Sequence, residues 1–392
     1  MFWPGALAFG YPGVLGPRWQ EMFGVGRGAV GNIMFFVLAA LGIFMFLVGR
    51  WQERYGCRAM MTVGAVLTGL NVLVVAFATD IWMVYLWGFL NGTASCFIYM
   101  PALTVVQRWF PARRGLVSGI VNLVFGSAAA IMSVLFAGML VSMGYRSMNL
   151  LVAGLALATG VVAAQFASEP ARVALPSVAV GAKAAGPAGR RVAPPPGGAG
   201  MTVRESLRTG NFWFMWLTWA LLGAAGIAMV TLSVSYGRAR GFSAESAVVV
   251  LTAFNLTNGL SRIFAGYFSD RIRRNLTITA TAVLAGVAYL LLPHVGDLAL
   301  IALLAALVGL AFGTLFAVSA PLAVDCFGLK HFGPIFGLVF TAYGFVAGLL
   351  GPSLSGYLLD ASGDEYLPVF SYLGGLCLAA ALLIQFVRPR RA

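Results

Sequence analysis

The chain has 392 residues, of which 60% are hydrophobic and only 9% are charged, and its formal net charge is +13. A soluble domain carries about 25% charged residues, so this composition excludes a water-soluble enzyme and a disordered chain and indicates an integral membrane protein. The four cysteines lie far apart without metal-ligand spacing. We therefore expect no disulfide framework, no metal site and no cofactor.

Twelve apolar runs follow one another along the chain between clusters of charge. Because a hydrocarbon core about 30 Å thick needs about 20 apolar helical residues, each run predicts one transmembrane helix. Their approximate limits are 2–17, 29–49, 59–79, 81–107, 115–144, 148–168, 211–236, 247–268, 276–293, 298–324, 332–358 and 366–387. Gly and Ala occur throughout the runs and β alternation is absent, which favours an all-α bundle over a barrel.

The first run is short for a spanning helix and contains Pro4 and Pro12. No basic region precedes it, as a secretory signal would require. We expect the natural start of the protein to lie upstream of Met1.

The basic residues are distributed unequally between the two sides of the predicted bundle. Loops after even-numbered runs, together with the C-terminal tail, hold 19 Lys and Arg, the opposite loops hold five, and Arg262 lies inside a run. By the positive-inside rule, this predicts a multi-pass protein of the cytoplasmic (inner) membrane with both termini cytoplasmic. The positive charge then reflects topology in a lipid bilayer, and we expect no nucleic-acid partner.

A stretch rich in Ala, Gly and Pro at 169–210 separates six runs from six. It predicts a cytoplasmic linker between an N-terminal six-helix bundle, 1–168, and a C-terminal six-helix bundle with a short basic tail, 211–392. A weak repeat with offsets of 217 and 218 residues relates the two halves. Because six helices restore the same sidedness, the halves are predicted to be parallel repeats with a substrate site between them.

The loop after the second run has the pattern G-x-x-x-[DE]-R-x-G-x-[RK], and the loop after the eighth run repeats its beginning. The residues that form the two copies are Gly49, Glu53, Arg54, Gly56 and Arg58 in the first, and Gly266, Asp270 and Arg271 in the second. An acidic side chain can accept bonds at a neighbouring helix N-terminus and an arginine can hold carbonyls. We predict a latch that forms in one conformation only. The alternative is that these charges only follow the positive-inside rule and make no specific contact.

These loops resemble those of the major facilitator superfamily. Further similarity comes from Tyr99, Pro101, the segment 109–115, Asn258 to Arg262, and the segment 341–352, which together resemble the oxalate/formate antiporter branch and its monocarboxylate transporter relatives. The resemblance covers nearly the whole chain. It implies twelve transmembrane helices in two six-helix parallel repeats and the transport of a small organic anion.

Arg262 is the basis of the substrate prediction. An arginine at membrane depth costs roughly 2.5–3.5 kcal/mol on insertion scales, so a function is expected of it. Asn258 and Asn255 lie four and seven residues before it, on the same helical face. This stripe would offer a guanidinium fork for a carboxylate and two amides for its remaining oxygens. Alternatively, the side chain snorkels or pairs with a carbonyl.

No Asp or Glu lies inside a run beside Arg262, so a single positive charge is predicted to bind a monoanion. In the resemblance, oxalate-handling members carry a lysine where this chain has Tyr343, and monocarboxylate transporters carry an aspartate where it has Asn258. These differences favour a lactate- or formate-like monocarboxylate over oxalate and argue against proton coupling through an Asp–Arg pair.

Several aromatic residues are weaker candidates for the same site. Tyr11, Tyr99 and Tyr343 come from runs expected to line the cavity, and Phe340 lies one turn before Tyr343. Each is equally compatible with packing or an interfacial belt. Asn122 lines the same space or bonds a neighbouring helix backbone, and His331 lies at a run end where a solvated or capping role is expected.

The sequence therefore predicts a secondary active transporter for a small organic monoanion, working by alternating access, with exchange favoured and a monomer as the functional unit. Exchange is favoured because an empty site would carry bare Arg262 through the occluded state. A transport-inactive sensor or signalling subunit on the same fold, or a carrier of a different anionic solute, remains the alternative. No run contains a catalytic constellation, so an enzyme is not expected.

Overall fold

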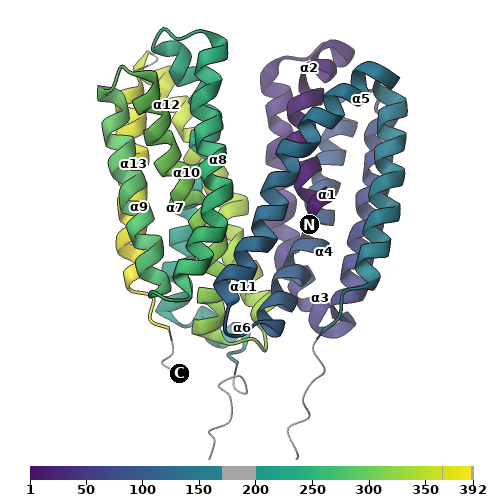
Figure 1. Ribbon diagram of the computed structural model, residues 1–392, viewed down its shortest axis with the longest axis vertical. Helices are drawn as coiled ribbons and strands as arrows, with labels where there is room; N and C mark the ends of the chain where they lie inside the picture. The colour runs from purple at the N-terminus through teal and green to yellow at the C-terminus, as the bar shows by residue number, and fades with distance from the viewer. Residues whose placement is uncertain (170–199, 364, 390–392) are drawn as a thin grey trace, which may run out of the picture.

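A computed structural model of the protein describes residues 1–169, 200–363 and 365–389. Within these ranges the chain forms helices and no strand, and it therefore has the predicted all-α class. Figure 1 shows two bundles that stand side by side, the first formed by α1 to α5 and the second by most of the later helices.

The first half contains six spans, but its helical elements do not correspond to them one to one. They are α1 (Phe2–Gly5), the π-helix η1 (Ala6–Gly10), α2 (Tyr11–Phe23), α3 (Arg27–Ala76), α4 (Ile81–Trp109) and α5 (Arg114–Gln165). A 50-residue helix would be about 75 Å long, far more than one crossing needs, and α3 is in fact broken at Gly56 by a φ of 80° and a ψ of 167°. Gly144 breaks α5 in the same way with a φ of 77°. Each of these helices thus holds two of the predicted spans.

In the described part of the second half no helical element holds two of the predicted spans. It contains α6 (Val203–Leu207), α7 (Gly210–Ala239), α8 (Ala244–Ser269), α9 (Arg274–Leu291), the 3-10 turn η2 (Leu292–His294), α10 (Leu298–Phe327), α11 (Phe332–Thr341), the π-helices η3 (Ala342–Ala347) and η4 (Leu349–Ser353), α12 (Leu354–Ser362) and α13 (Tyr366–Gln385). Nine helices of the described part are long and apolar enough to cross a membrane. Since α3 and α5 each hold two spans and the first span is divided among α1, η1 and α2, this agrees with twelve crossings.

The predicted linker, 169–210, lies mostly outside the described residues, because 170–199 are not described. Its end is helical: the Thr202 hydroxyl accepts from the backbone N–H of Glu205, and the Glu205 carboxylate accepts from that of Thr202, which is a capping box. The N–H of Met201 donates to the carbonyl oxygen of Phe327 at 2.9 Å. This last bond attaches the end of the linker to α10.

We call the end of the molecule that carries the loops 50–58, 108–114, 270–274 and 328–331 the linker face; it is the lower end in Figure 1. Near this face the halves touch through glycines. A Cβ added to Gly49 of α3 would collide with the backbone of Gly333 of α11, and one added to Gly115 of α5 would collide with the backbone of Gly266 of α8. Because Gly49 is equivalent to Gly266 and Gly115 to Gly333 in the repeat, the two glycine pairs are symmetry-related copies of one contact between the halves.

The same crossed pattern continues one turn deeper. A Cβ on Gly337 would lie 2.6 Å from the carbonyl oxygen of Met45, and a Cβ on Gly119 would collide with the carbonyl oxygen of Arg262. Met45 and Arg262 are 217 residues apart, the same offset as the repeat. Absence of a side chain at these glycines lets α3 approach α11, and α5 approach α8, to backbone contact.

Candidate functional site

Arg262 lies on α8 at the contact between the halves and is only 5% exposed. Two glycines of α5 make room for it. Gly119 meets the backbone of Arg262, and a Cβ on Gly126 would lie 3.1 Å from Nη1 of the guanidinium. The arginine is therefore enclosed by the opposite half.

The partners of the guanidinium are neutral. Its Nη1 donates to the backbone carbonyl oxygen of Asn122 at 2.7 Å, and its Nη2 donates to Oδ1 of Asn258 at 3.3 Å. The cation also stands over the ring of Phe316, with Cζ 5.1 Å from the ring centroid, which is within cation–π range. In the described part of the chain Nε is buried without a hydrogen-bond partner, and no carboxylate forms an ion pair with this arginine.

Asn122 of α5 connects three helices at this point. Its Oδ1 accepts from the Tyr99 hydroxyl of α4 at 2.8 Å. Its Nδ2 donates to the carbonyl oxygens of Ser118 at 2.8 Å and of Phe316 on α10 at 3.3 Å. The side chain thus bonds the backbone of a neighbouring helix, one of its two expected roles.

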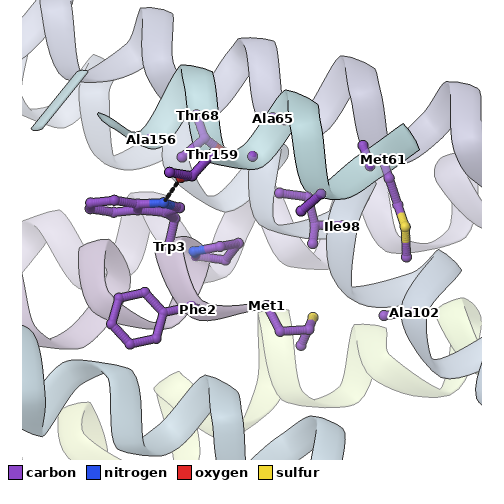
Figure 2. Close-up of a pocket in the computed structure, with 14 residues that line it drawn as sticks. Met1, Phe2, Trp3, Met61, Ala65, Thr68, Ile98, Ala102, Ala156 and Thr159 are labelled. Atoms are coloured by element: carbon purple, nitrogen blue, oxygen red, sulfur yellow. Dashed lines mark hydrogen bonds between the residues drawn. The ribbon is translucent and has the colours of Figure 1, made fainter. Parts of the chain in front are cut away.

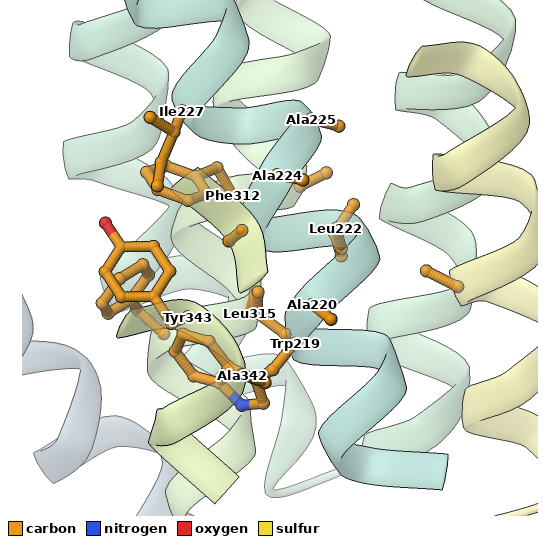
Figure 3. Close-up of a cluster of buried hydrophobic side chains, with 14 of the residues drawn as sticks. Trp219, Ala220, Leu222, Ala224, Ala225, Ile227, Phe312, Leu315, Ala342 and Tyr343 are labelled. Carbon is orange, nitrogen blue, oxygen red and sulfur yellow. The ribbon is translucent and has the colours of Figure 1, made fainter. Parts of the chain in front are cut away.

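Aromatic rings form a wall beside the guanidinium. Phe340 of α11 lies 5.9 Å from Tyr99 and 5.6 Å from Tyr343 between ring centroids, and Phe316 lies 5.5 Å from Tyr343. Trp219 of α7 packs behind them, 4.6 Å from Phe340. Figure 3 shows Tyr343 and Trp219 in this cluster, with the Tyr343 hydroxyl directed away from the rings. That hydroxyl makes no hydrogen bond to any other described residue.

Tyr343 belongs to the π-helix η3, where the helix of the eleventh span widens. Gly344 of η3 faces Gly42 of α3, and a Cβ on Gly344 would lie 2.6 Å from the Gly42 Cα. Single π turns inside α-helices are rare and occur frequently at functional sites. This turn places Tyr343 at the contact between the halves.

The structure brings together five of the seven predicted binding residues: Arg262, Asn258, Tyr99, Phe340 and Tyr343. It does not bring Tyr11 to this cluster. The Tyr11 hydroxyl donates to Oδ1 of Asn149, and its ring packs at 5.0 Å from Trp87 in a separate core of the first half. Asn255 is exposed on the surface of α8 and has no hydrogen bond to the described residues.

The second copy of the predicted latch contacts a helix N-terminus across the halves. The Asp270 carboxylate accepts from the backbone N–H groups of Gly115 and Leu116, at 2.9 and 3.0 Å, at the start of α5. It also pairs with Arg274 at 3.1 Å, and Arg274 pairs in turn with Asp325 of α10. A carboxylate at this position is favoured by the unpaired amides of the helix end.

The first copy uses a different partner. Oε1 of Glu53 lies 3.0 Å from Nδ1 of His331, the residue that precedes α11. Gly56 provides the positive φ of the loop, while Arg58 donates to the carbonyl oxygen of Ala167 within the same half. The guanidinium of Arg54 lies over the ring of Tyr55, and that of Arg271 lies over the ring of Tyr267. In this copy the cross-half contact is therefore made by Glu53.

A separate apolar cavity of about 540 Å³ lies within the first half and contains none of the predicted site residues. Figure 2 shows its wall, where Nε1 of Trp3 donates to the Thr159 hydroxyl at 2.7 Å. Among the described residues, no three His, Cys, Asp or Glu side chains gather as a metal site would require.

Sequence reasoning missed Phe316, and although it named Asn122 as a candidate it did not predict that the main chain of Asn122 would bind Arg262. Phe316 contributes its ring to Arg262 and its carbonyl to Asn122, and Asn122 contributes a backbone carbonyl to Arg262. A phenylalanine in an apolar run and a main-chain oxygen carry no sequence signal. The repeat did carry a signal for Asn122. Because Gly119 matches Gly337, Asn122 is equivalent to Phe340 of the second half, so a polar residue replaces an aromatic one.

Comparison with known proteins gives one consistent result. The profile of the Major Facilitator Superfamily matches residues 5–251 and 241–392. The oxalate:formate antiporter of Oxalobacter formigenes is 25% identical over 348 residues, covering 87% of this chain and 78% of that protein. Monocarboxylate transporter 13 of Bos taurus is 26% identical over 391 residues, covering 97% and 86%. The resemblance predicted from the motifs is therefore confirmed.

Among solved structures, the fucose:proton symporter of E. coli superimposes with a TM-score of 0.73 at 15% identity, over 99% of this chain and 97% of that one. At this identity the likeness concerns the fold alone. It confirms the predicted twelve-helix arrangement in two halves.

Proposed function

The chain belongs to the major facilitator superfamily, whose members are membrane transporters and not enzymes, and we propose that it carries a small organic monoanion by alternating access. The favoured cargo is a lactate- or formate-like monocarboxylate. Residues 1–168 and 211–392 are the two units that rock about Arg262, within a single monomer in the cytoplasmic membrane. The linker face, with the richer supply of Lys and Arg, is cytoplasmic.

The observation that supports a monoanion is the unpaired charge of Arg262. The side chain is buried, its partners in the described chain are two neutral oxygens, and its Nε–H has none. A buried cation without a counter-ion is costly. One bound carboxylate would neutralise it, whereas a dianion would leave a negative charge uncompensated.

The geometry favours a side-on approach to the guanidinium. The Nε–H group and one Nη2–H group lie on the same edge and can donate in parallel to two carboxylate oxygens. The Asn258 oxygen that now accepts from Nη2 fills part of this position. On anion binding, rotation of the Asn258 amide would present Nδ2 as a donor.

The aromatic wall would hold the rest of the cargo. Tyr99, Phe340 and Tyr343 present apolar ring surface to a short aliphatic body, and the Tyr343 hydroxyl can donate to a substrate oxygen. The resemblance to the oxalate/formate antiporter branch implies a lysine in oxalate-handling members in the place of Tyr343. One cation instead of two supports a preference for monocarboxylates.

The latch contacts would hold the linker face closed between transport steps. Asp270 at the start of α5 and Glu53 at His331 each join one half to the other. Both sets of bonds must break when the halves separate at this face. A transport-inactive sensor on the same fold is the second candidate, and it would bind the anion without moving it.

The test is uptake into proteoliposomes with labelled lactate, pyruvate, formate, acetate and oxalate. The wild type should show saturable uptake of monocarboxylates that is accelerated by the same anion on the far side. Arg262→Ala should abolish it, and Arg262→Lys should retain a weaker activity, while the exposed Arg238→Ala serves as the matched control. Retained saturable transport in Arg262→Ala would refute the site, and binding without uptake would favour the sensor.

A further inference from the structure

The hydrogen bond from Arg262 to Asn122 crosses from the second half to the first. It lies at the deep end of the close contact between α8 and α5, where Gly119 meets the backbone of Arg262 and Gly115 meets that of Gly266. No passage to the linker face can open along this contact while the helices touch. Opening must therefore break the bond between Nη1 and the Asn122 carbonyl.

Asn122 makes a second bond across the same boundary, from Nδ2 to the carbonyl oxygen of Phe316. The Tyr99 hydroxyl donates to Oδ1 of the same amide, which fixes the amide orientation and directs Nδ2 toward Phe316. All three side chains are at least nine-tenths buried while the linker face is closed, so these bonds form away from water and contribute to holding this face closed.

We propose that Asn122 is a positioning residue that makes opening of the linker face depend on a bound anion. In the empty carrier, separation of α5 from α8 takes the Asn122 carbonyl away from Arg262 and leaves Asn258 as its remaining acceptor in the described chain, so opening is disfavoured until water reaches the site. In the loaded carrier the carboxylate stays on the guanidinium and compensates its charge while Asn122 departs. Exchange is then favoured over net flow, because the neutral acceptor of Arg262 belongs to the opposite half and is lost on opening, whereas a bound anion stays with the guanidinium. The inference rests on the proposed function in taking Arg262 as the ligand of the anion.

The main-chain carbonyl cannot be removed by substitution, but the side-chain part of the contact can. Asn122→Ala deletes the bond to Phe316 and the acceptor for Tyr99. Asn149→Ala is the matched control, because Asn149 is also a buried asparagine of α5 that accepts from a tyrosine, here Tyr11 of its own half. A tyrosine-to-phenylalanine change at Tyr99, with Tyr85 as its control, disturbs the same amide without altering helix packing.

The first readout needs no cargo. Spin labels at Phe110 and Ile272, which are both 52% exposed and belong to opposite halves, would report the separation at the linker face of the anion-free protein. Asn122→Ala should increase the population of the open form about fivefold, the effect of about one buried hydrogen bond, and Tyr99→Phe should act in the same direction. Neither Asn149→Ala nor Tyr85→Phe should shift it.

The second readout is the ratio of exchange to net efflux in proteoliposomes, measured with the best anion of the panel. In Asn122→Ala this ratio should fall about fivefold, because net efflux rises while exchange persists. A purely structural defect would lower both rates together. An unchanged open population in anion-free Asn122→Ala, or an unchanged ratio, would overturn the proposal, even if Arg262→Ala abolishes transport as the proposed function requires.

Discussion

Oδ1 of Asn258 accepts from Nη2 of Arg262 at 3.3 Å, so a neutral amide stands where a carboxylate would complete an ion pair. Replacing the Asn258 amide by a carboxylate of the same shape would therefore change the net charge of the site by one unit.

Asn258→Asp should supply Arg262 with an internal counter-ion and make the carried anion compete with it. We expect the KM for a monocarboxylate to rise at least about tenfold at neutral pH, the cost of displacing a paired charge. Because the new carboxylate must bind a proton before the anion can replace it, uptake should increase as the pH falls. Uptake assays between pH 5 and 8 would check this, with Asn275→Asp at the linker face as control.

Tyr343→Lys should move the preference of the site from monocarboxylates toward dicarboxylates. A second cation beside the aromatic wall would compensate the second negative charge of oxalate. Competition between labelled formate and unlabelled oxalate measures the shift, which we expect to reach about tenfold. Tyr343→Phe keeps the ring contacts and removes only the hydroxyl, so it should weaken monocarboxylate binding about fivefold without raising oxalate affinity. An unaltered oxalate preference in the lysine variant would place this residue outside the binding site.

Asp270→Asn should weaken closure of the linker face. The carboxylate accepts from two N–H groups at the start of α5 and pairs with Arg274, and a neutral amide replaces these by weaker bonds at a cost of about 1 kcal/mol or more. Spin labels at Phe110 and Ile272 should report a larger open population. Asp297→Asn is the control, since Asp297 caps its own helix, α10, through the N–H of Leu300. Equal responses of the two variants would exclude a latch.

Gly119→Ala should prevent the close approach of α5 to α8. The added methyl group would collide with the carbonyl oxygen of Arg262, and overpacking of a tight contact typically costs about 1–3 kcal/mol. We expect transport to fall more than tenfold and thermal stability to drop. The same change at Gly259 of α8, where a Cβ meets nothing within 4 Å, should be nearly neutral in both assays.

The spans were predictable because each crossing needs an uninterrupted apolar run, a local requirement that the sequence displays directly. The breaks at Gly56 and Gly144 agree with the predicted span ends, and only glycine adopts their positive φ without strain. The π-helical turns around Tyr343 were not predictable, because they depend on how η3 packs against α3 and α7.

The site was predictable where one helix carries the pattern. Arg262 and Asn258 are four residues apart and meet as expected. The bond to Asn122 links residues 140 positions apart through a main-chain oxygen, so neither periodicity nor residue type marks it. Tyr11 illustrates the opposite case: a tyrosine in an apolar run is chemically suited to a site, but tertiary packing placed it beside Trp87.

Met45 and Arg262 hold equivalent places in the two halves, each with its carbonyl oxygen against a glycine of the other half. One of these symmetry-related crossings is neutral and the other is charged. The neutral crossing separates at the cost of its packing contacts and of the Glu53–His331 contact at its end, whether or not an anion is bound, whereas the charged one responds to an anion in the site. Of the two equivalent crossings, only the one at Arg262 therefore senses the bound anion. Substitutions around Met45 should change the rate of conformational exchange equally in the loaded and the empty protein.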